Sequence, residues 1–241
     1  MTIEGLRQFI LSQGPSKNVV NLDWTIIWAI NKKVIDPISP RHTAVLEDRK
    51  VTCRILGVSK AAHSEDKPKH AKNPSLGNKK VYYGPTILID QADAASFTQG
   101  EEITLMNWGN AFVTSITSSD STTSHISSID LTLHLTGDFK KTQKKITWLE
   151  PATQSLVPVD LVDFDYLITK DKLEEEDDVK DFVNPKTEWR FAAWADEGVW
   201  DVKVGDVVQF ERKGYFRLDK AADKQGGKAV FFAIPTGKEA K

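Results

Sequence analysis

The residues best suited to chemistry in this chain of 241 residues lie in one run near its end. The run 209–217 (QFERKGYFR) alternates polar and apolar side chains, which indicates two β-strands around a turn near Gly214. Gln209 and Arg212 both carry planar hydrogen-bonding groups, which suit the edge of an exposed nucleobase. Strict alternation would place Arg212 on the side of Phe210, so we expect it at a bulge or at the rim of the sheet. The alternative interpretation is an ordinary edge strand with solvated polar side chains.

Sequence signatures of common enzymes do not occur in this chain. There is no Gly-x-x-x-x-Gly-Lys phosphate loop, no Gly-x-Gly-x-x-Gly turn and no Gly-x-Ser-x-Gly elbow. His63 and Glu65 match the His-x-Glu of zinc deaminases, but the partner motif Pro-Cys-x-x-Cys is missing. The single cysteine, Cys53, cannot build a structural zinc cluster, and we expect it in the core. We therefore predict no catalytic residue and no metal site.

Charge and hydropathy limit the possible partners. The formal net charge is −2, from 32 basic and 34 acidic residues, so a site for a polyanion must be local. Acidic residues gather at 174–178, and basic residues gather at 67–80, 140–145 and 212–220. No apolar run approaches the ~18 residues of a membrane span, and the first residues do not form a signal peptide. We therefore expect a cytosolic protein without membrane contact.

The first 36 residues have the apolar spacing of two helices. The first helix ends at Gly14, and the second is expected to be capped by Asn21 and closed by Asp36 before Pro37. A helix pair of this length has too little core to be stable alone, so it should pack on another part of the protein.

After Pro40 the sequence consists of short runs of β-branched and aromatic residues separated by turn residues, which is typical of antiparallel sheets or barrels. We expect mobile loops at 61–80 and 173–181, because both are polar and poor in apolar residues. The number of strands is sufficient for two barrels. The predicted strands lie near 42–47, 51–58, 81–89, 102–107, 111–116, 124–135, 145–149, 158–167, 188–194, 206–212, 214–219 and 228–234.

Several ordered blocks resemble eukaryotic glutamyl-tRNA synthetases, in the region that follows the catalytic domain. The resemblance spans essentially the whole chain and includes the paired anticodon-binding barrels shared with the glutaminyl enzymes. The blocks are GLRQFI (5–10), AINKKVIDP (29–37), PRHTAV (40–45), HAKNPSLG (70–77), TWL (147–149), VPV (157–159), NP (184–185) and QFERKGYF (209–216).

This resemblance implies a mainly β fold with a short helical connector at residues 1–40. Residues 41–241 would then form two six-stranded-type anticodon-binding β-barrels, proximal and distal, with the C-terminal strands returning to the proximal barrel. The active-site signatures of the family, His-Ile-Gly-His and a Lys-Met-Ser-Lys-like motif, are absent. We therefore expect a fragment that is inactive alone and needs no cofactor, joined in the intact enzyme to a catalytic domain that uses ATP, Mg and glutamate.

The resemblance also names the residues that would bind RNA. In the glutaminyl relative an arginine, and a glutamine and arginine from a late strand pair, hold the central uridine of the anticodon. These match Arg41, Gln209 and Arg212 here, and the implied partner is tRNA(Glu) rather than DNA. Lys72 is a candidate for the RNA backbone and Trp108 for base stacking, although a solvated lysine and a buried tryptophan explain them equally well.

Two other interpretations of the sequence remain open. The arginines that read the first and third anticodon bases in the glutaminyl enzyme align near Ser96 and Met106, so those contacts cannot be transferred. The first alternative is the corresponding region of a glutaminyl-tRNA synthetase. The second is a β-rich protein-interaction module that docks partners along exposed strand edges without RNA.

Overall fold

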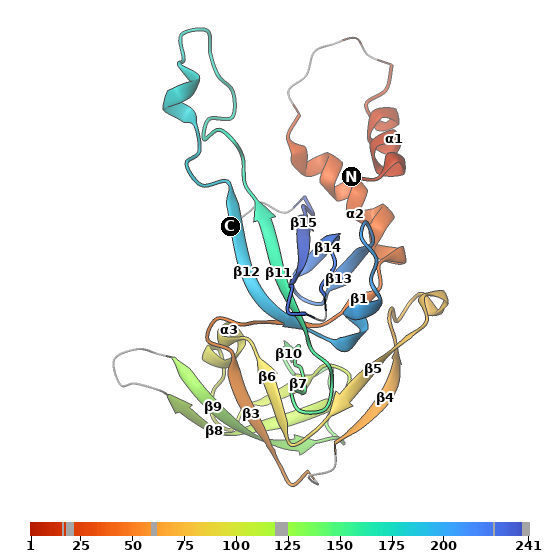
Figure 1. Ribbon diagram of the computed structural model, residues 1–241, viewed down its shortest axis with the longest axis vertical. Helices are drawn as coiled ribbons and strands as arrows, with labels where there is room; N and C mark the ends of the chain where they lie inside the picture. Colours follow the sequence, from red (N-terminus) through yellow and green to blue (C-terminus); the bar gives the residue numbers. More distant parts are fainter. Residues whose placement is uncertain (16, 18–21, 59–61, 119–124, 224, 238–241) are drawn as a thin grey trace.

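The computed structural model describes residues 1–241 except 16, 18–21, 59–61, 119–124, 224 and 238–241. Two helices are followed by two curled sheets, and Figure 1 shows them as successive tiers of an elongated molecule. The helix pair lies at one end, the sheet containing β1 and β13–β15 lies in the middle, and the sheet containing β3 and β6–β10 lies at the other end. The prediction of a mainly β fold with two barrel-like parts behind short N-terminal helices is confirmed.

The helical connector consists of α1 (Ile3–Ser12) and α2 (Trp24–Ile35). The helices meet closely because Asn31 of α2 accepts hydrogen bonds at its side-chain oxygen from the backbone N–H and the hydroxyl of Thr2, at 2.8 and 2.9 Å. The carboxylate of Asp23 caps α2, whereas Asn21, the expected cap, lies outside the described residues. As expected, α2 ends at Asp36, where the short helix η1 (Asp36–Ile38) begins.

A seven-stranded sheet unites the two ends of the β region, because its first strands precede residue 47 and the others follow residue 156. Its core is aromatic: the ring of Phe210 packs edge-on against Phe216 and Phe231, with centroid distances of 5.4 and 5.1 Å. In sheet order, the strands are β1 (Arg41–His42), β13 (Val207–Phe210), β14 (Gly214–Lys220), β15 (Ala229–Ile234), β11 (Val157–Phe164), β12 (Glu188–Ala195) and β2 (Ala44–Leu46).

A six-stranded sheet is formed by the residues between these two groups. On β3, Val51, Cys53 and Ile55 are buried while the alternate residues are exposed, as expected for a strand with one face on a core. This confirms the prediction for Cys53. In sheet order, the strands are β10 (Lys145–Ile146), β7 (Glu102–Leu105), β8 (Gly109–Ser118), β9 (Ile126–His134), β3 (Val51–Leu56) and β6 (Thr86–Ile89); α3 (Gln91–Ala95) follows β6 in the chain.

The basic segment 61–80 was predicted to be a loop, and this prediction is wrong. It contains β4 (His63–Pro68), η2 (Pro74–Leu76) and the start of β5 (Asn78–Tyr83), and β4 pairs with β5 in an antiparallel hairpin. Nearly all of β4 is exposed, so the strand has no buried face and its sequence lacks the alternation that marks a strand. The single strand expected over 81–89 is divided at Gly84 and Pro85.

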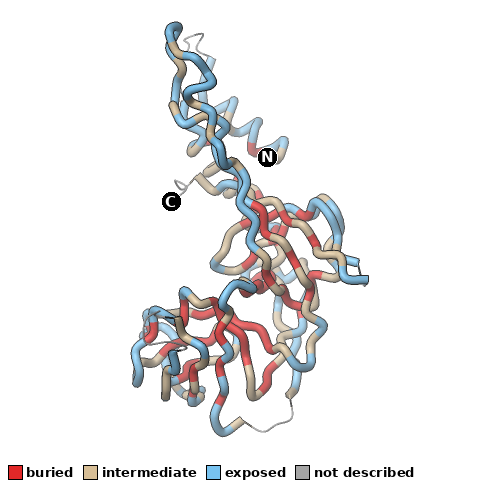
Figure 2. Tube along the Cα trace, turned by 60° about the vertical axis from the view of Figure 1, so that its left-hand side comes forward, coloured by how far each residue is buried: buried red, intermediate tan, exposed pale blue. Residues whose placement is uncertain are grey.

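A long hairpin arm extends from β11 and β12 beyond the seven-stranded sheet (Figure 1). Figure 2 shows that the arm is largely exposed, in contrast to the buried strands below it. The acidic stretch 173–181 lies in this arm and leads into η3 (Val179–Phe182), whose cap is Asp178. The remaining short helix, η4 (Glu197–Asp201), follows β12.

Candidate functional site

Arg41 and Gln209 lie side by side although 167 residues separate them in the chain. The strands β1 and β13 are parallel, and Arg41 stands directly opposite Gln209 in their register. The backbone N–H of Gln209 donates to the carbonyl of Pro40 at 2.9 Å, which fixes this register. Because residues opposite one another project from the same face of a sheet, both side chains lie on one face.

Each of these two side chains holds a buried polar atom without a partner. Among the described residues, neither Nε of Arg41 nor Oε1 of Gln209 has a hydrogen-bond partner in the protein. Buried polar atoms are nearly always paired, and an unpaired one costs about 1–3 kcal/mol. The two atoms are a donor and an acceptor on neighbouring side chains, and this arrangement can bind a planar ligand that offers an acceptor beside a donor.

A tyrosine and a carboxylate lie close to Arg41 and Gln209. Tyr215 of β14 stands opposite Gln209 in register, and its hydroxyl donates to Oδ1 of Asp36. The same oxygen lies 3.8 Å from Nη2 of Arg41, whose side chain is 29% exposed. Burial and the hydrogen bond to Asp36 raise the pKa of Tyr215 well above its usual range, so the phenol stays protonated.

The loop between β4 and β5 fixes the segment that leads into Arg41. The backbone N–H of Arg41 donates to the carbonyl of Lys69 at 2.7 Å. His70 contacts the carbonyl of Asp36 through Nε2 at 3.1 Å, and Asn73 donates to the carbonyl of Pro37 at 2.8 Å. The other ring nitrogen of His70 accepts from the backbone N–H at position 72, so Nε2 carries the proton. The block 70–77 therefore anchors η1 and β1.

Arg212, the third residue of the predicted set, occupies a different position. It lies in the turn between β13 and β14 with φ of 67°, which explains why strand alternation did not place it. Its guanidinium binds the carboxylate of Asp93 in α3 through two bonds of 2.5 and 2.6 Å. The neighbouring Lys213 pairs with Asp90. The structure therefore brings Arg41 and Gln209 together and holds Arg212 at the contact between the two sheets.

A broad groove lies beside this contact. Its volume is about 980 Å³, and residues of the seven-stranded sheet and of α3 line it. Arg49, Arg190 and the half-exposed ring of Phe191 face the groove together with Arg212. These groups can contact phosphates and stack on bases, which are the two interactions that single-stranded RNA requires.

A buried charge cluster that sequence analysis missed lies beneath β1. Asp196 accepts from His42 Nδ1 at 2.8 Å and from the N–H of Thr43 at 2.7 Å, and Lys79 Nζ lies 3.4 Å away. Lys79 also lies 3.7 Å from Glu211. Burial alone would raise the pKa of Asp196, but the interactions with His42 and Lys79 lower it far below its usual range. These residues are far apart in sequence, and no local pattern predicts that His42, Lys79 and Asp196 meet.

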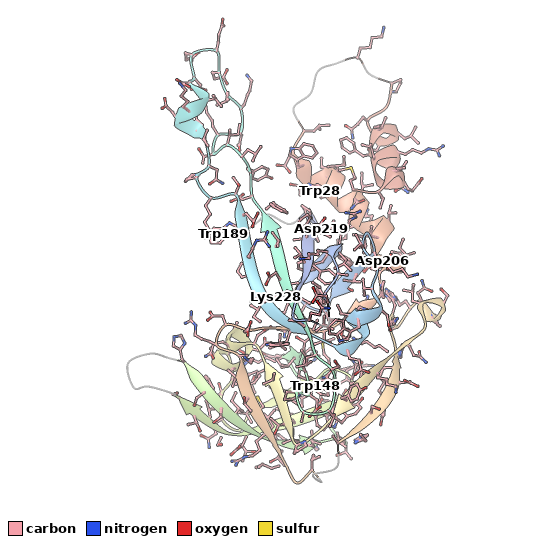
Figure 3. All side chains as sticks on the ribbon, in the orientation of Figure 1. Trp28, Trp148, Trp189, Asp206, Asp219 and Lys228 are labelled. Atoms are coloured by element: carbon pink, nitrogen blue, oxygen red, sulfur yellow. The ribbon has the colours of Figure 1, made fainter. Side chains whose placement is uncertain are left out.

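The two other candidates from the sequence, Lys72 and Trp108, lie on the anchoring loop and in a core. Lys72 is exposed on the anchoring loop, close in sequence to His70. Trp108 packs against Tyr83 and Trp148, with centroid distances of 5.2 and 4.9 Å, in the core of the six-stranded sheet. Figure 3 shows Trp148 inside that sheet, whereas Trp189 lies at the start of β12, where the arm joins the seven-stranded sheet.

Ser96 and Met106, which align with the arginines for the first and third anticodon bases, lie in the six-stranded part of the protein. Ser96 ends α3, and the carbonyl of Met106 accepts from Trp148 Nε1 at 2.9 Å. Within the described part of the chain, no group of three or more His, Cys, Asp or Glu side chains is arranged to hold a metal ion. The described helices are all too short or too polar to cross a membrane.

Comparison with known proteins agrees with this architecture. The family model described as the anticodon-binding domain of class I tRNA synthetases (E and Q) matches residues 39–134, and a second model of the same description matches residues 145–219. Together they cover well over half of the chain.

Relatives match nearly the whole chain. A protein named probable cytoplasmic glutamate–tRNA ligase from Schizosaccharomyces pombe is 56% identical over 99% of this chain and 32% of its own length. The cytoplasmic glutamate–tRNA ligases of Saccharomyces cerevisiae and Arabidopsis thaliana are 52% and 44% identical over 99% and 100% of this chain, and 32% and 33% of their own lengths. The chain thus spans about a third of the length of the curated relatives it matches. The resemblance is confirmed, and the chain belongs to the anticodon-binding domain family of the class I tRNA synthetases for glutamate and glutamine.

Proposed function

We propose that this chain binds tRNA(Glu) by its anticodon, as the anticodon-binding part of a cytoplasmic glutamate–tRNA ligase. One observation carries the proposal: Arg41 Nε and Gln209 Oε1 are buried and without partners among the described residues, and the two residues stand opposite one another on neighbouring strands. A ligand that paired both atoms would remove a desolvation penalty that the free protein carries. Family membership supports RNA as that ligand.

Uracil has the complementary edge. Its N3–H can donate to Oε1 of Gln209, and a neighbouring carbonyl can accept from Nε–H of Arg41. Cytosine has no hydrogen on N3 and carries an amino group in place of O4, so the contact to Gln209 would be lost and only the O2 carbonyl could still accept from Arg41. The Arg41–Gln209 pair should therefore prefer uracil to cytosine at the middle position of the anticodon.

Arg212 and Lys72 would extend the site. Two of the five N–H groups of Arg212 are used by Asp93, and its side chain is 39% exposed, so the remaining donors can reach a base or a phosphate beside the groove. Lys72 is exposed on the loop that anchors β1, and we assign it a contact to the RNA backbone. DNA and membranes are not partners in this proposal.

The whole protein would join glutamate to tRNA(Glu) with ATP and Mg, in the cytoplasm, and this chain itself would hold no cofactor. The relatives are named glutamate–tRNA ligases, not glutamine–tRNA ligases, which favours the glutamyl over the glutaminyl alternative. The connector would attach to a catalytic domain through large apolar side chains that are exposed on α1 and α2. These are Ile3, Leu6, Ile10, Leu11, Trp24 and Ile26.

Fluorescence anisotropy with a labelled anticodon stem–loop tests the proposal. We expect Arg41→Ala and Gln209→Ala each to weaken binding of the uracil-containing loop by about 1–3 kcal/mol. A loop with cytosine at the middle position should bind the unmodified chain more weakly and should respond little to either substitution. Arg54→Ala serves as a control, because Arg54 is an exposed arginine paired with Asp130 on the six-stranded sheet.

Two results would reject the proposal. One is unchanged affinity in both variants with the fold intact. The other is equal affinity for the two loops at moderate salt, which would favour the protein-interaction alternative. Aminoacylation of tRNA by the full-length protein with each amino acid separates the glutamyl from the glutaminyl function.

A further inference from the structure

We propose that Asp36 is a positioning residue that holds the guanidinium of Arg41 in the orientation needed to read the base. This inference rests on the proposed function. The juxtaposition is specific: Oδ1 of Asp36 lies 3.8 Å from Nη2 of Arg41 and accepts the hydroxyl of Tyr215. Asp36 belongs to the helical connector, whereas Arg41 begins the β region.

The end of α2 does not explain an acid at this position. Asp36 is the C-terminal cap of α2, where the partial negative charge of the helix end disfavours a carboxylate, although it is also the first residue of the three-residue helix η1. The preceding turn contains Lys32 and Lys33, which are the charges that a helix end favours. A carboxylate that opposes the helix dipole therefore points to a role outside α2, and its contacts lead to Arg41 and Tyr215.

The orientation of Arg41 matters because its base-reading atom has no partner of its own. A guanidinium is planar and rigid, so holding one Nη atom constrains the direction of Nε–H. The side chain otherwise has several rotatable bonds, and its Nε is unpartnered among the described residues. An ion pair at Nη2 reduces this freedom and leaves Nε available to the ligand.

Asp36 is itself held by three separate elements. Its backbone N–H donates to Lys32 within α2, and its carbonyl receives Nε2 of His70 from the loop between β4 and β5. Tyr215 of β14 fixes the carboxylate, and Tyr215 also stands opposite Gln209. The side chain of Asp36 is therefore a fixed reference point, even though it is 46% exposed.

The sign of the change in RNA affinity distinguishes this positioning role from a simple effect of the charge of Asp36. Asp36 is a negative charge near a site for a polyanion, so its simple removal should strengthen RNA binding. If Asp36 positions Arg41, its removal should weaken binding of the uracil loop instead. The two explanations predict opposite signs.

A double-mutant cycle in the full chain tests the proposal with uracil and cytosine stem–loops as probes. We expect Asp36→Asn to weaken uracil-loop binding by about fivefold to tenfold, and to lower the uracil-to-cytosine affinity ratio by a similar factor. In the Arg41→Ala background, Asp36→Asn should change the affinity by less than about twofold, because nothing remains to be positioned. Asp36→Glu should restore part of the affinity ratio.

Asp130→Asn is the matched control, because Asp130 pairs with an exposed arginine, Arg54, on the six-stranded sheet outside the groove. It should leave the affinity ratio unchanged. Tyr215→Phe is the second variant in case Asp36→Asn does not fold: it frees the carboxylate of Asp36 without changing any charge, and should lower the ratio only when Arg41 is present.

The outcomes are distinct. Tighter uracil binding by Asp36→Asn, or a loss of the same size with and without Arg41, would overturn the positioning role while leaving the proposed function intact. If Arg41→Ala itself has no effect, the proposed function fails and the positioning role fails with it.

Discussion

The two sheets of this protein have different interiors. The core of the six-stranded sheet is apolar, and its buried polar side chains include a neutral set in which Thr104 hydrogen-bonds to Asn110 and Thr142. The seven-stranded sheet also has an apolar core, but its β1 edge carries the buried charges of Lys79 and Asp196.

Buried polar atoms that lack a hydrogen bond are also distributed unevenly between the two sheets. Among the described residues, such atoms of charged or amide side chains belong to Arg41, Gln209 and Glu211, all at the β1–β13 edge, and the Glu211 oxygen lies 3.7 Å from Lys79 Nζ. The fourth such atom is the neutral hydroxyl of Thr147. The molecule therefore retains buried polar groups at a cost in stability along the β1–β13 edge. We place RNA recognition at this edge.

The largest effect is expected from Asp196→Asn. The substitution removes the nearer of the two carboxylates beside the buried Lys79, and breaking a buried pair in this way costs about 3–5 kcal/mol. Urea unfolding should show this loss, whereas Asp130→Asn on the six-stranded sheet, which breaks a surface pair with Arg54, should cost far less. Equal losses in the two variants would remove the distinction between the two interiors.

The acid dependence of stability should follow the same carboxylate. The pKa of Asp196 is lowered in the folded protein, so its contribution is fully present above the unfolded value of about 3.9 and is lost as the pH falls below it. The gap in unfolding free energy between the unmodified chain and Asp196→Asn should therefore narrow between about pH 4 and pH 2. Urea titrations at several acidic pH values measure the gap; a constant gap would show that Asp196 is not held ionised.

Arg41 and Arg212 should respond in opposite ways. Arg212→Ala removes the two bonds to Asp93 that join the sheets, and should cost about 1 kcal/mol of stability after allowance for solvent screening of a partly exposed side chain. Arg41→Ala removes a side chain with an unpartnered atom, and should affect RNA binding rather than stability. Thermal denaturation and the RNA-binding assay, applied to both variants, distinguish a structural role from a binding role. A larger loss of stability for Arg41→Ala than for Arg212→Ala would contradict these roles.

The smallest effect concerns Cys53 in the six-stranded sheet. Burial and the charge of Asp130 raise the pKa of its thiol to about 12, so almost no thiolate exists near neutral pH. We expect no reaction with Ellman's reagent at pH 8 in the folded protein, and reaction of one thiol per chain in denaturant. Rapid labelling of the folded protein would mean that this interior is open.

Local pattern predicted those parts of the fold in which one face is buried. Alternation on β3 and around Phe210 marked strands, and the helix end at Asp36 was visible from the proline that follows it. The strand β4 was missed because both of its faces are exposed, so it depends on pairing with β5 rather than on a core.

The site was less accessible to sequence reasoning. No local signal links Arg41 to Gln209, and only resemblance to a family placed them together. The residue types also gave no sign that Arg212 is bound by Asp93 while Nε of Arg41 has no partner among the described residues. The carboxylates near these two arginines, Asp93 and Asp36, come from other elements of the chain.

The central claim is tested most directly by an experimental structure of the chain bound to an anticodon stem–loop of tRNA(Glu). Our account predicts that the Watson–Crick edge of the middle base lies within hydrogen-bonding distance of Arg41 Nε and Gln209 Oε1. A complex in which that base binds elsewhere, and both atoms still lack a partner, would contradict it.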